Sequence, residues 1–233
     1  MGKGQEERGD SMDKKRNLQL PPAVWAFAAA IVMTLLAGIG VLRRADFSVS
    51  DALYQSREAS DGDIAIVEID QRALEDIGPY KEWGRDIFAQ TINTLNMSED
   101  CRPAVICLDV LFTGETNPEA DASLLEAAGR YGNVAFACAA EFGTALVEGP
   151  DGTQRLDPFS ILDFSLPYEA LREASMQGHI NTMQDVDGVL RHHMLTLTLP
   201  DGTTYPSLAL LAAEKYQEYH GLPPVTLPPT DSR

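Results

Sequence analysis

The stretch AVICLDVLFTGETNPEADASLLEAAGRYGNVAFACA, residues 104–139, decides the fold of this chain. Its two ends, residues 104–112 and 133–139, are nearly continuous apolar runs, which is the pattern of strands buried on both faces. Between them, Asn117 and Pro118 mark the start of a helix, because asparagine is a favoured N-cap and proline fits the first helical position. A strand, a helix and a second strand in this order predict parallel strands with a covering helix.

The residues upstream continue the same alternation. The run IAIVEID, residues 64–70, predicts a strand. Residues 71–77 are typical of a short helix that Asp70 caps and a Gly-Pro pair ends. Residues 85–97 predict a longer helix, because their apolar side chains recur at helical spacing.

The downstream half predicts shorter elements separated by turns. A Gly-Pro-Asp-Gly sequence within residues 144–157 indicates a hairpin or an exposed excursion. Beyond it we predict, in order, a helix at 166–175, strands at 178–183 and 189–199, and a helix at 206–219. These segments predict one α/β domain over residues 61–220, with a mixed central sheet of parallel core strands and flanking helices. A Pro-rich tail follows at residues 221–233.

Residues 23–42, AVWAFAAAIVMTLLAGIGVL, carry no charge and predict a transmembrane helix. A helix of this length spans roughly 30 Å, the thickness of the hydrocarbon core of a bilayer. A buried core helix would show a polar stripe, and a cleaved signal peptide would have a shorter apolar region and a small-residue cleavage site. Trp25 lies where an interfacial aromatic side chain is expected. We therefore predict an uncleaved single-pass anchor, with residues 43–60 as a stalk.

The charge of the chain divides at this segment. The 233 residues include 18 Lys and Arg against 35 Asp and Glu, a formal charge of −17. Seven of the basic and four of the acidic residues lie in residues 1–44, which leaves −20 for the remainder. Basic residues favour the cytoplasmic side, so we predict a cytoplasmic segment 1–22 and an extracytoplasmic domain, although Arg43 and Arg44 weaken the bias. A body this acidic argues against nucleic acid as a partner.

Two acidic residues inside predicted strands are the first candidates for a site. Asp70 ends one strand and Asp109 lies within another, and a carboxylate there must be paired or solvated in a cleft. Strand ends of open α/β sheets face the usual ligand crevice, and Arg85 is a cationic partner within reach. Asn181, beside a later turn, completes the candidate ligand-binding set. The alternative is structural: a helix cap for Asp70, an ion pair for Asp109 and a backbone contact for Asn181.

Other chemistry-bearing residues form no recognisable motif. There is no Gly-rich phosphate loop, no nucleophile elbow and no paired-cysteine or His-x-x-x-His spacing. His192 and His193 are adjacent in a predicted strand, so their side chains point to opposite faces and do not readily chelate one ion. Cys107 and Cys138 lie in apolar runs that are typical of small buried hydrophobic residues. We therefore predict no catalytic residue, no metal and no cofactor.

Six segments, taken in order, resemble the CHASE2 sensory domain of bacterial membrane receptors. They are DALYQSR (51–57), IAIVEIDQRAL (64–74), WGRDIFAQTINTL (83–95), AVICLDVLF with NPEADASLLEA (104–127), GHINTMQDVDGVLRHH (178–193) and YPSLAL (205–210). No single segment is specific, but together they cover most of residues 51–215 in the right order.

The resemblance implies an extracytoplasmic, ligand-sensing domain upstream of membrane helices and of a cytoplasmic output module, such as a cyclase or a kinase. It implies an unidentified small-molecule signal and a homodimer, and it assigns no binding residue. The sequence contains no output domain, so the expectation is a fragment of a longer receptor or a sensor whose output partner is another chain. Two other functions stay open: an anchored metal-dependent hydrolase using Asp70 and Asp109, and a structural domain that holds a partner.

Overall fold

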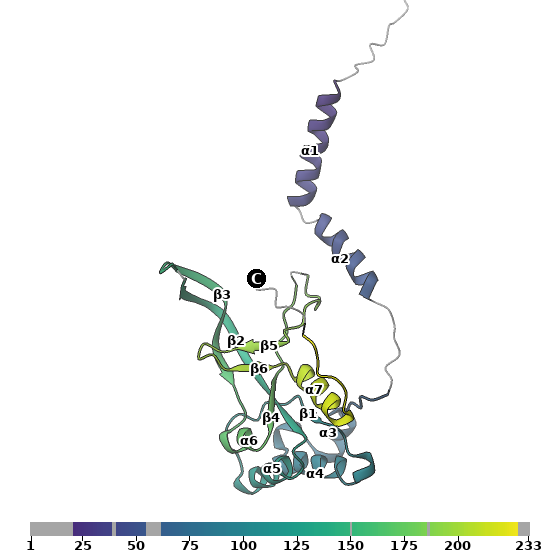
Figure 1. Ribbon diagram of the computed structural model, residues 1–233, viewed down its shortest axis with the longest axis vertical. Coiled ribbons are helices and arrows are strands. Elements are labelled where there is room, and N and C mark those ends of the chain that lie inside the picture. Colours follow the sequence, from purple (N-terminus) through teal and green to yellow (C-terminus); the bar gives the residue numbers. More distant parts are fainter. Residues whose placement is uncertain (1–20, 39–40, 55–61, 150, 186, 228–233) are drawn as a thin grey trace, which may run out of the picture. The chain divides into compact units, whose positions relative to one another are not determined.

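The structure is a computed structural model that describes residues 21–38, 41–54, 62–149, 151–185 and 187–227 (Figure 1). The chain forms two units, residues 1–68 and 69–233. The regular elements described in the first unit are two helices, α1 (Pro22–Gly38) and α2 (Val41–Tyr54).

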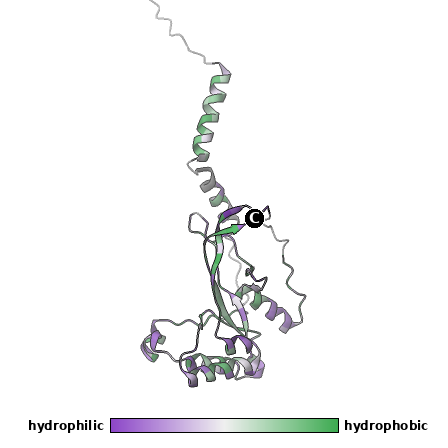
Figure 2. Cartoon of the chain, turned by 90° about the vertical axis from the view of Figure 1, so that its left-hand side faces the viewer, coloured by the Kyte–Doolittle hydropathy of each residue, from purple (hydrophilic) through white to green (hydrophobic). Residues whose placement is uncertain are grey.

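Helix α1 is apolar on all sides. None of its residues is buried, and Trp25 and Phe27 are 65% and 70% exposed; Figure 2 shows the hydrophobic colouring along its length. Within the described residues, no helix combines the length and the apolar character needed to cross a membrane. The predicted span 23–42 continues past α1 through residues 39 and 40, which lie outside the described residues. The same holds for residues 55–60 of the predicted stalk, of which α2 covers the part up to Tyr54.

The second unit is a mixed α/β domain, as predicted. Its helices are α3 (Gln71–Ile77), α4 (Arg85–Leu95), α5 (Pro118–Tyr131), α6 (Glu169–Glu173) and α7 (Leu208–His220), with short 3-10 turns at Tyr80–Glu82 and Glu99–Cys101. Its strands are β1 (Ile106–Leu108), β2 (Val134–Glu148), β3 (Gln154–Ser165), β4 (Met176–His179), β5 (Thr196–Thr198) and β6 (Thr204–Pro206).

Strand β2 lies at the centre of the sheet. Its first half pairs in parallel with β1 on one side and with β4 on the other, in register Ile106↔Val134 and Ala135↔Met176. Its second half pairs with β3 in an antiparallel hairpin, which projects as a two-stranded arm (Figure 1). Of the two alternatives predicted for residues 144–157, a hairpin or an exposed excursion, the structure contains the hairpin, and its strands β2 and β3 extend beyond these residues. The parallel core strands and the mixed sheet follow the prediction.

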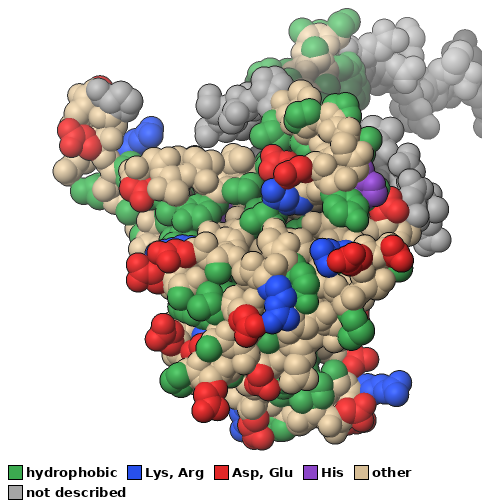
Figure 3. All heavy atoms as spheres, turned by 60° about the horizontal axis from the view of Figure 1, so that its bottom comes forward, with side chains coloured by type: hydrophobic (Ala, Val, Ile, Leu, Met, Phe, Trp, Pro, Cys, Tyr) green, Lys and Arg blue, Asp and Glu red, His purple; other side chains and the backbone are tan. Residues whose placement is uncertain are grey.

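Helices cover both faces of the parallel part of the sheet. On one face, α4 and α5 lie side by side and enclose the core, whose fully buried side chains include Ile92, Leu124 and Phe136 (Figure 1). Side chains alternate along a strand, so Ala135 and Ala137 face the opposite side, where α7 contacts β1, β2 and β4. The face drawn in Figure 3 carries many acidic side chains, with fewer basic ones among them.

Residues 64–70 do not form the predicted strand. The segment is extended but has no ladder partner in the described part of the chain, and Ile64 and Ile66 are both 80% exposed. A strand needs a neighbour that pairs with its backbone, and an apolar, β-branched composition alone does not supply one. The strand predicted at 189–199 is similarly reduced to Thr196–Thr198, which pairs with β6.

Candidate functional site

Asp70 is the N-cap of α3, which is the structural alternative given above for this residue. Its Oδ1 accepts a hydrogen bond of 2.8 Å from the backbone N–H of Ala73 and closes the first turn of α3. The side chain is exposed and does not line the cavity beside Asp109. The two carboxylates are therefore not brought together in one pocket.

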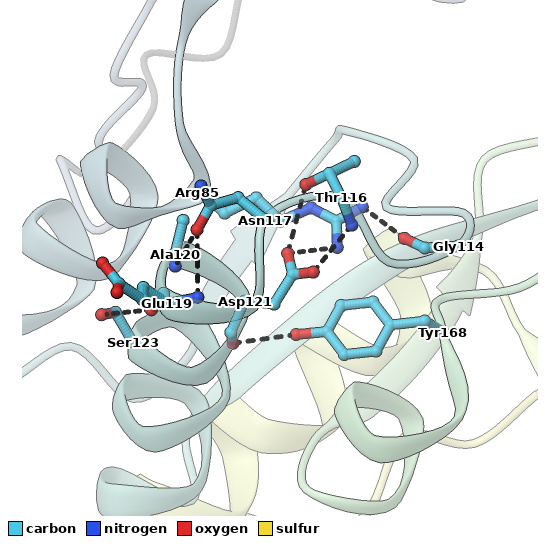
Figure 4. Close-up of polar contacts among 9 residues, drawn as sticks. All are labelled: Arg85, Gly114, Thr116, Asn117, Glu119, Ala120, Asp121, Ser123 and Tyr168. Carbon is cyan, nitrogen blue, oxygen red and sulfur yellow. Dashed lines mark hydrogen bonds and ion pairs between the residues drawn. The ribbon is translucent and has the colours of Figure 1, made fainter.

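Arg85 is held in a buried ion pair at the start of α4 (Figure 4). Its Nη1 donates to Asp121 Oδ1 at 2.7 Å, and its Nη2 donates to the carbonyl of Gly114 at 2.5 Å. The guanidinium also lies over the Tyr168 ring, 4.9 Å from the centroid. The carboxylate partner of Arg85 is thus Asp121 of α5 rather than Asp70 or Asp109.

Asp121 is fully engaged by the same cluster. Its Oδ2 accepts from the backbone N–H of Thr116 at 2.7 Å, and its own carbonyl accepts from the Tyr168 hydroxyl at 3.1 Å. Nearby charge on Asp121 and, above all, burial raise the pKa of Tyr168. Because every charged group here has a partner inside the protein, the cluster ties α4, α5 and the intervening loop together.

Asn181 extends the sheet beyond the end of β4. Its Oδ1 accepts from the backbone N–H of Ala140 at 2.8 Å, and its Nδ2 donates to the Ala140 carbonyl at 2.7 Å. The side chain thus imitates the pairing of a strand residue with β2. Both polar atoms of its amide bind the backbone, which is the structural alternative given above for this residue.

Asp109 borders the cavity that remains as the candidate ligand site. The cavity has a volume of about 340 Å³ and lies on the α7 side of the sheet, at the carboxyl ends of β1 and β4. Its walls come from three regions: Cys107 and Asp109 in or just after β1, His179, Ile180 and His193 near the end of β4 and the following segment, and Leu208, Ala209 and Ala212 on α7. Crevices at this edge of parallel strands are the common ligand positions in open α/β sheets.

His179 lies in the wall of this cavity without a hydrogen-bond partner. It is 1% exposed, and neither Nδ1 nor Nε2 is paired within the described part of the chain. Burial, together with the neighbouring His193, lowers the pKa of His179, so the ring is neutral at pH 7. An unpaired buried polar atom costs about 1–3 kcal/mol, and native proteins rarely retain one without a reason.

The opposite wall of the cavity is the N-terminal turn of α7. Ser207 is its N-cap, and Ser207 Oγ accepts from the backbone N–H of Leu210 at 3.1 Å. The same hydroxyl lies 3.1 Å from His193 Nε2. Ser207 and His179 also form an isolated parallel β-bridge. Ser207 therefore joins the start of α7 to two residues of the cavity wall, His179 and His193.

The segment after the cavity is closed by an ion-pair cluster. Arg191 Nη1 lies 2.9 Å from Asp185 Oδ2, and Arg191 Nη2 lies 2.9 Å from Asp187 Oδ2. The hydrogen bond from Arg191 lowers the pKa of Asp187. Arg191 and the two aspartates, all within the segment 178–193 quoted above, thus close a loop through their own side chains.

Sequence reasoning singled out Asp109 but missed His179 and Ser207. The predicted strands 178–183 and 104–112 placed His179 and Asp109 in their interiors. In the structure, His179 is the last residue of β4 and Asp109 directly follows β1, two places away in the sheet. Cys138 is buried as predicted, and burial raises the pKa of its thiol to about 12, whereas Cys107 is exposed.

Comparison with known proteins gives one match. No curated protein and no solved structure matches the chain. The family model of the CHASE2 domain matches residues 26–231, which include most of α1 and the whole of the described α/β unit. Because this match covers most of the sequence, the chain belongs to the CHASE2 domain family of extracytoplasmic sensory domains.

Proposed function

We propose that this chain is the membrane-anchored, extracytoplasmic sensor part of a bacterial signal-transduction receptor. A small molecule binds the cavity between β1, β4 and α7, and the binding is passed to a cytoplasmic output module such as a cyclase or a kinase. The observation that carries the proposal is the buried, unpaired His179 in the wall of a 340 Å³ cavity.

Helix α7 is the element through which occupancy of the cavity would act. Leu208, Ala209 and Ala212 of α7 line the cavity, and its N-cap Ser207 contacts His193. A ligand that fills the cavity therefore touches the helix directly and favours one of its positions over another. A ligand that binds one of two such arrangements more tightly than the other shifts the equilibrium toward it, and this shift is the signal that a sensor passes on. In this proposal the sensor works as a homodimer, the arrangement implied by the family resemblance.

The proposal of a membrane anchor is supported by the uncharged run at residues 23–42 and by the exposed apolar surface of α1. An apolar helix without a buried face gains stability when lipid replaces water around it. The basic residues that precede the run favour a cytoplasmic N-terminus.

Labelling of the cysteines can test on which side of the membrane the domain lies. Cys101 is exposed and Cys138 is buried. A membrane-impermeant maleimide added to intact spheroplasts should label the Cys107→Ser variant at Cys101, and Cys138 should react only after denaturation. The Cys101→Ser, Cys107→Ser double variant is the matched control. Labelling that appears only after lysis would place the domain in the cytoplasm and overturn the proposal.

The site can be tested by filling the cavity from α7. We expect Ala212→Phe to abolish the binding of small ligands to the full-length chain in lipid nanodiscs, because Ala212 lines the cavity. Ala213→Phe is the matched control, since Ala213 is the exposed neighbour on the same helix and does not line the cavity. Equal loss of binding in both variants, or none in either, would contradict the assignment of the site.

A further inference from the structure

The β2–β3 arm is a two-stranded ribbon that exposes apolar side chains (Figure 1). Among the described strands, β3 pairs with β2 alone, so its other edge is unpaired. Leu146, Leu156 and Phe159 of the arm are 59%, 70% and 62% exposed. A two-stranded ribbon is at best marginally stable in water, and an unpaired edge strand is a template for a further strand. The arm therefore has the features of an interaction element.

The free edge of β3 presents the backbone of Leu156. The N–H of Gly149 donates to the carbonyl of Thr153 at 2.8 Å, so the backbone of Thr153 faces β2. Backbone groups of successive residues in an antiparallel pair point alternately toward the partner strand and away from it. No register shift separates Thr153 from Leu156. The N–H and C=O of Leu156, three residues on, therefore point away from β2 and are available to another strand.

The charges on either side of Leu156 are complementary to themselves. Arg155 is the single basic residue in 141–165, and no described residue pairs with it. If two copies of β3 lie antiparallel with Leu156 on a two-fold axis, each Arg155 stands opposite Asp157 of the other copy. Moving the axis by one residue would oppose Arg155 to Arg155, or Asp157 to Asp157. Opposite charges across an antiparallel pair are stabilising and like charges destabilising, so the charges select one register.

The same register joins the apolar side chains of the two arms. Leu146 lies directly opposite Leu156 within the arm, so their side chains share one face of the ribbon. Pairing at Leu156 places the two leucines of one copy beside those of the other, in a continuous row across a four-stranded sheet. Pro158 has no backbone N–H to give to the new ladder, which limits the pairing to the few residues around the axis.

The charge of the arm disfavours a lipid surface as the alternative partner. One arginine stands against five acidic residues in 141–165, and anionic headgroups would repel this excess. The acidic residues are Glu141, Glu148, Asp151, Asp157 and Asp163. A second copy is compatible with the arm in the register that places each Arg155 against an aspartate.

We propose that the arm is the contact between two copies of this chain, formed by antiparallel pairing of their β3 strands about a two-fold axis at Leu156. This inference rests on the proposed function, because it names the surface through which the homodimer proposed there is made. Strand β2 belongs both to the arm and to the parallel sheet, so the contact joins the sheets of the two copies.

Disulfide crosslinking of the full-length chain in membranes tests the register. The background Cys101→Ser, Cys107→Ser retains the buried Cys138. Leu156→Cys places two thiols across the axis, where paired Cα atoms are about 5.5 Å apart, within disulfide range. Gln154→Cys is the matched control, because it is equally exposed on the same strand but its two copies would lie about 13 Å apart. We expect at least tenfold faster oxidative crosslinking at position 156. Equal rates would overturn the proposal.

Charge reversal tests the pairing of Arg155 with Asp157. In the Leu156→Cys background, Arg155→Asp or Asp157→Arg alone opposes like charges at both positions, and we expect crosslinking to slow by about tenfold. When the two variants are co-expressed with tags of different size, each strand meets opposite charges again. The heterodimer should then crosslink as fast as the parent, which also shows that both variants fold. Failure of the mixed pair to recover, or no slowing in either variant alone, would contradict the pairing.

Sedimentation of the detergent-solubilised full-length chain separates this contact from the proposed function. If the chain is a dimer in which position 156 crosslinks no faster than position 154, the homodimer stands and the arm contact is overturned. If the chain is a monomer that does not crosslink, both are overturned. The cavity lies outside the arm, so the Ala212→Phe experiment decides the ligand site separately.

Discussion

A Cβ atom on Gly178 would lie 2.6 Å from the Cα of Leu208. Strand β4 and helix α7 therefore approach each other backbone to backbone, at a distance that only glycine permits. This contact sets the position of the helix that forms one wall of the cavity.

Gly178→Ala should accordingly destabilise the domain. The obstructing atoms belong to the Leu208 backbone rather than to a flexible side chain, so β4 or α7 must move to admit the methyl group. We expect a loss of about 1–3 kcal/mol in the free energy of unfolding, as for other overpacked sites. Urea unfolding of the full-length chain in nanodiscs, followed by far-UV circular dichroism, measures it.

Gly129→Ala is the matched control for that substitution. Gly129 lies inside α5, and its added Cβ would be 3.7 Å from the Cβ of Ala174, an ordinary contact. We expect this variant to gain roughly 0.5–1 kcal/mol, because alanine favours a helix interior over glycine. If both variants behave alike, the close approach of β4 and α7 is not what Gly178 provides.

The Arg85–Asp121 pair should contribute to stability as a pair. Their side chains are 9% and 8% exposed, so Arg85→Met leaves a buried carboxylate without its cation, and we expect a loss of about 3–5 kcal/mol. The double variant Arg85→Met, Asp121→Leu should be more stable than either single variant, because no buried charge is left unpaired. Thermal unfolding of the three variants measures the coupling.

A surface pair provides the comparison. Arg130 and Glu126 are 50% and 70% exposed, and Glu126→Gln should change stability by less than about 1 kcal/mol. An Arg85→Met variant as stable as Glu126→Gln would show that the Arg85 cluster contributes little to the fold.

His179 should make stability depend on pH. Burial lowers its pKa in the folded state below the ordinary value of 6.5, so the unfolded chain binds more protons at mildly acidic pH. Stability should therefore be independent of this group above pH 6.5 and fall as the pH decreases below it. The charged or titratable groups beside it in the cavity wall are His193, Asp109 and the Cys107 thiol.

The measurement is the slope of the unfolding free energy against pH between 7 and 5.5, a range chosen to stay above most carboxylate titrations. His179→Gln should reduce this slope. His192→Gln, a change at a side chain that is 77% exposed, should leave the slope unchanged. The reverse order would mean that the buried ring is not the group responsible.

Asn181→Ala should loosen the junction between β2 and β4. It removes two hydrogen bonds to the Ala140 backbone, for which we expect a loss of about 1–3 kcal/mol. Faster amide hydrogen exchange at Ala140 measures the effect locally. Gln184→Ala, at an exposed position in the same segment, should leave the exchange at Ala140 unchanged.

Local signals in the sequence predicted local structure well. Asp70 caps α3, and Asn117 with Pro118 begins α5, because these interactions join residues only a few positions apart. The apolar run 104–112 also predicted a strand of the central parallel sheet, because such a run is by itself the signal for a strand buried on both faces. Residues 106–108 of this run form β1.

Interactions between distant residues were not predictable in the same way. Arg85 and Asp121 are 36 positions apart, and an acidic residue in the first turn of a helix is already explained by the helix dipole. The strand expected at 64–70 has a strand-forming composition, yet pairing is a property of two segments and the sequence of one does not determine it. For the same reason His179 became visible as a candidate only when its surroundings were known.

Strand β2 runs without interruption from the parallel sheet into the projecting arm. Its residues up to Cys138 pair with β1 and β4, and the residues beyond pair with β3, with register shifts between Glu141 and Phe142 and between Gly143 and Ala145. The backbone of β2 is continuous through these irregularities, so the arm is covalently joined to the central strand of the sheet, which pairs on either side with β1 and β4, the strands that border the cavity. A displacement of the arm therefore acts on the same sheet against which α7, the helix that lines the cavity, is packed.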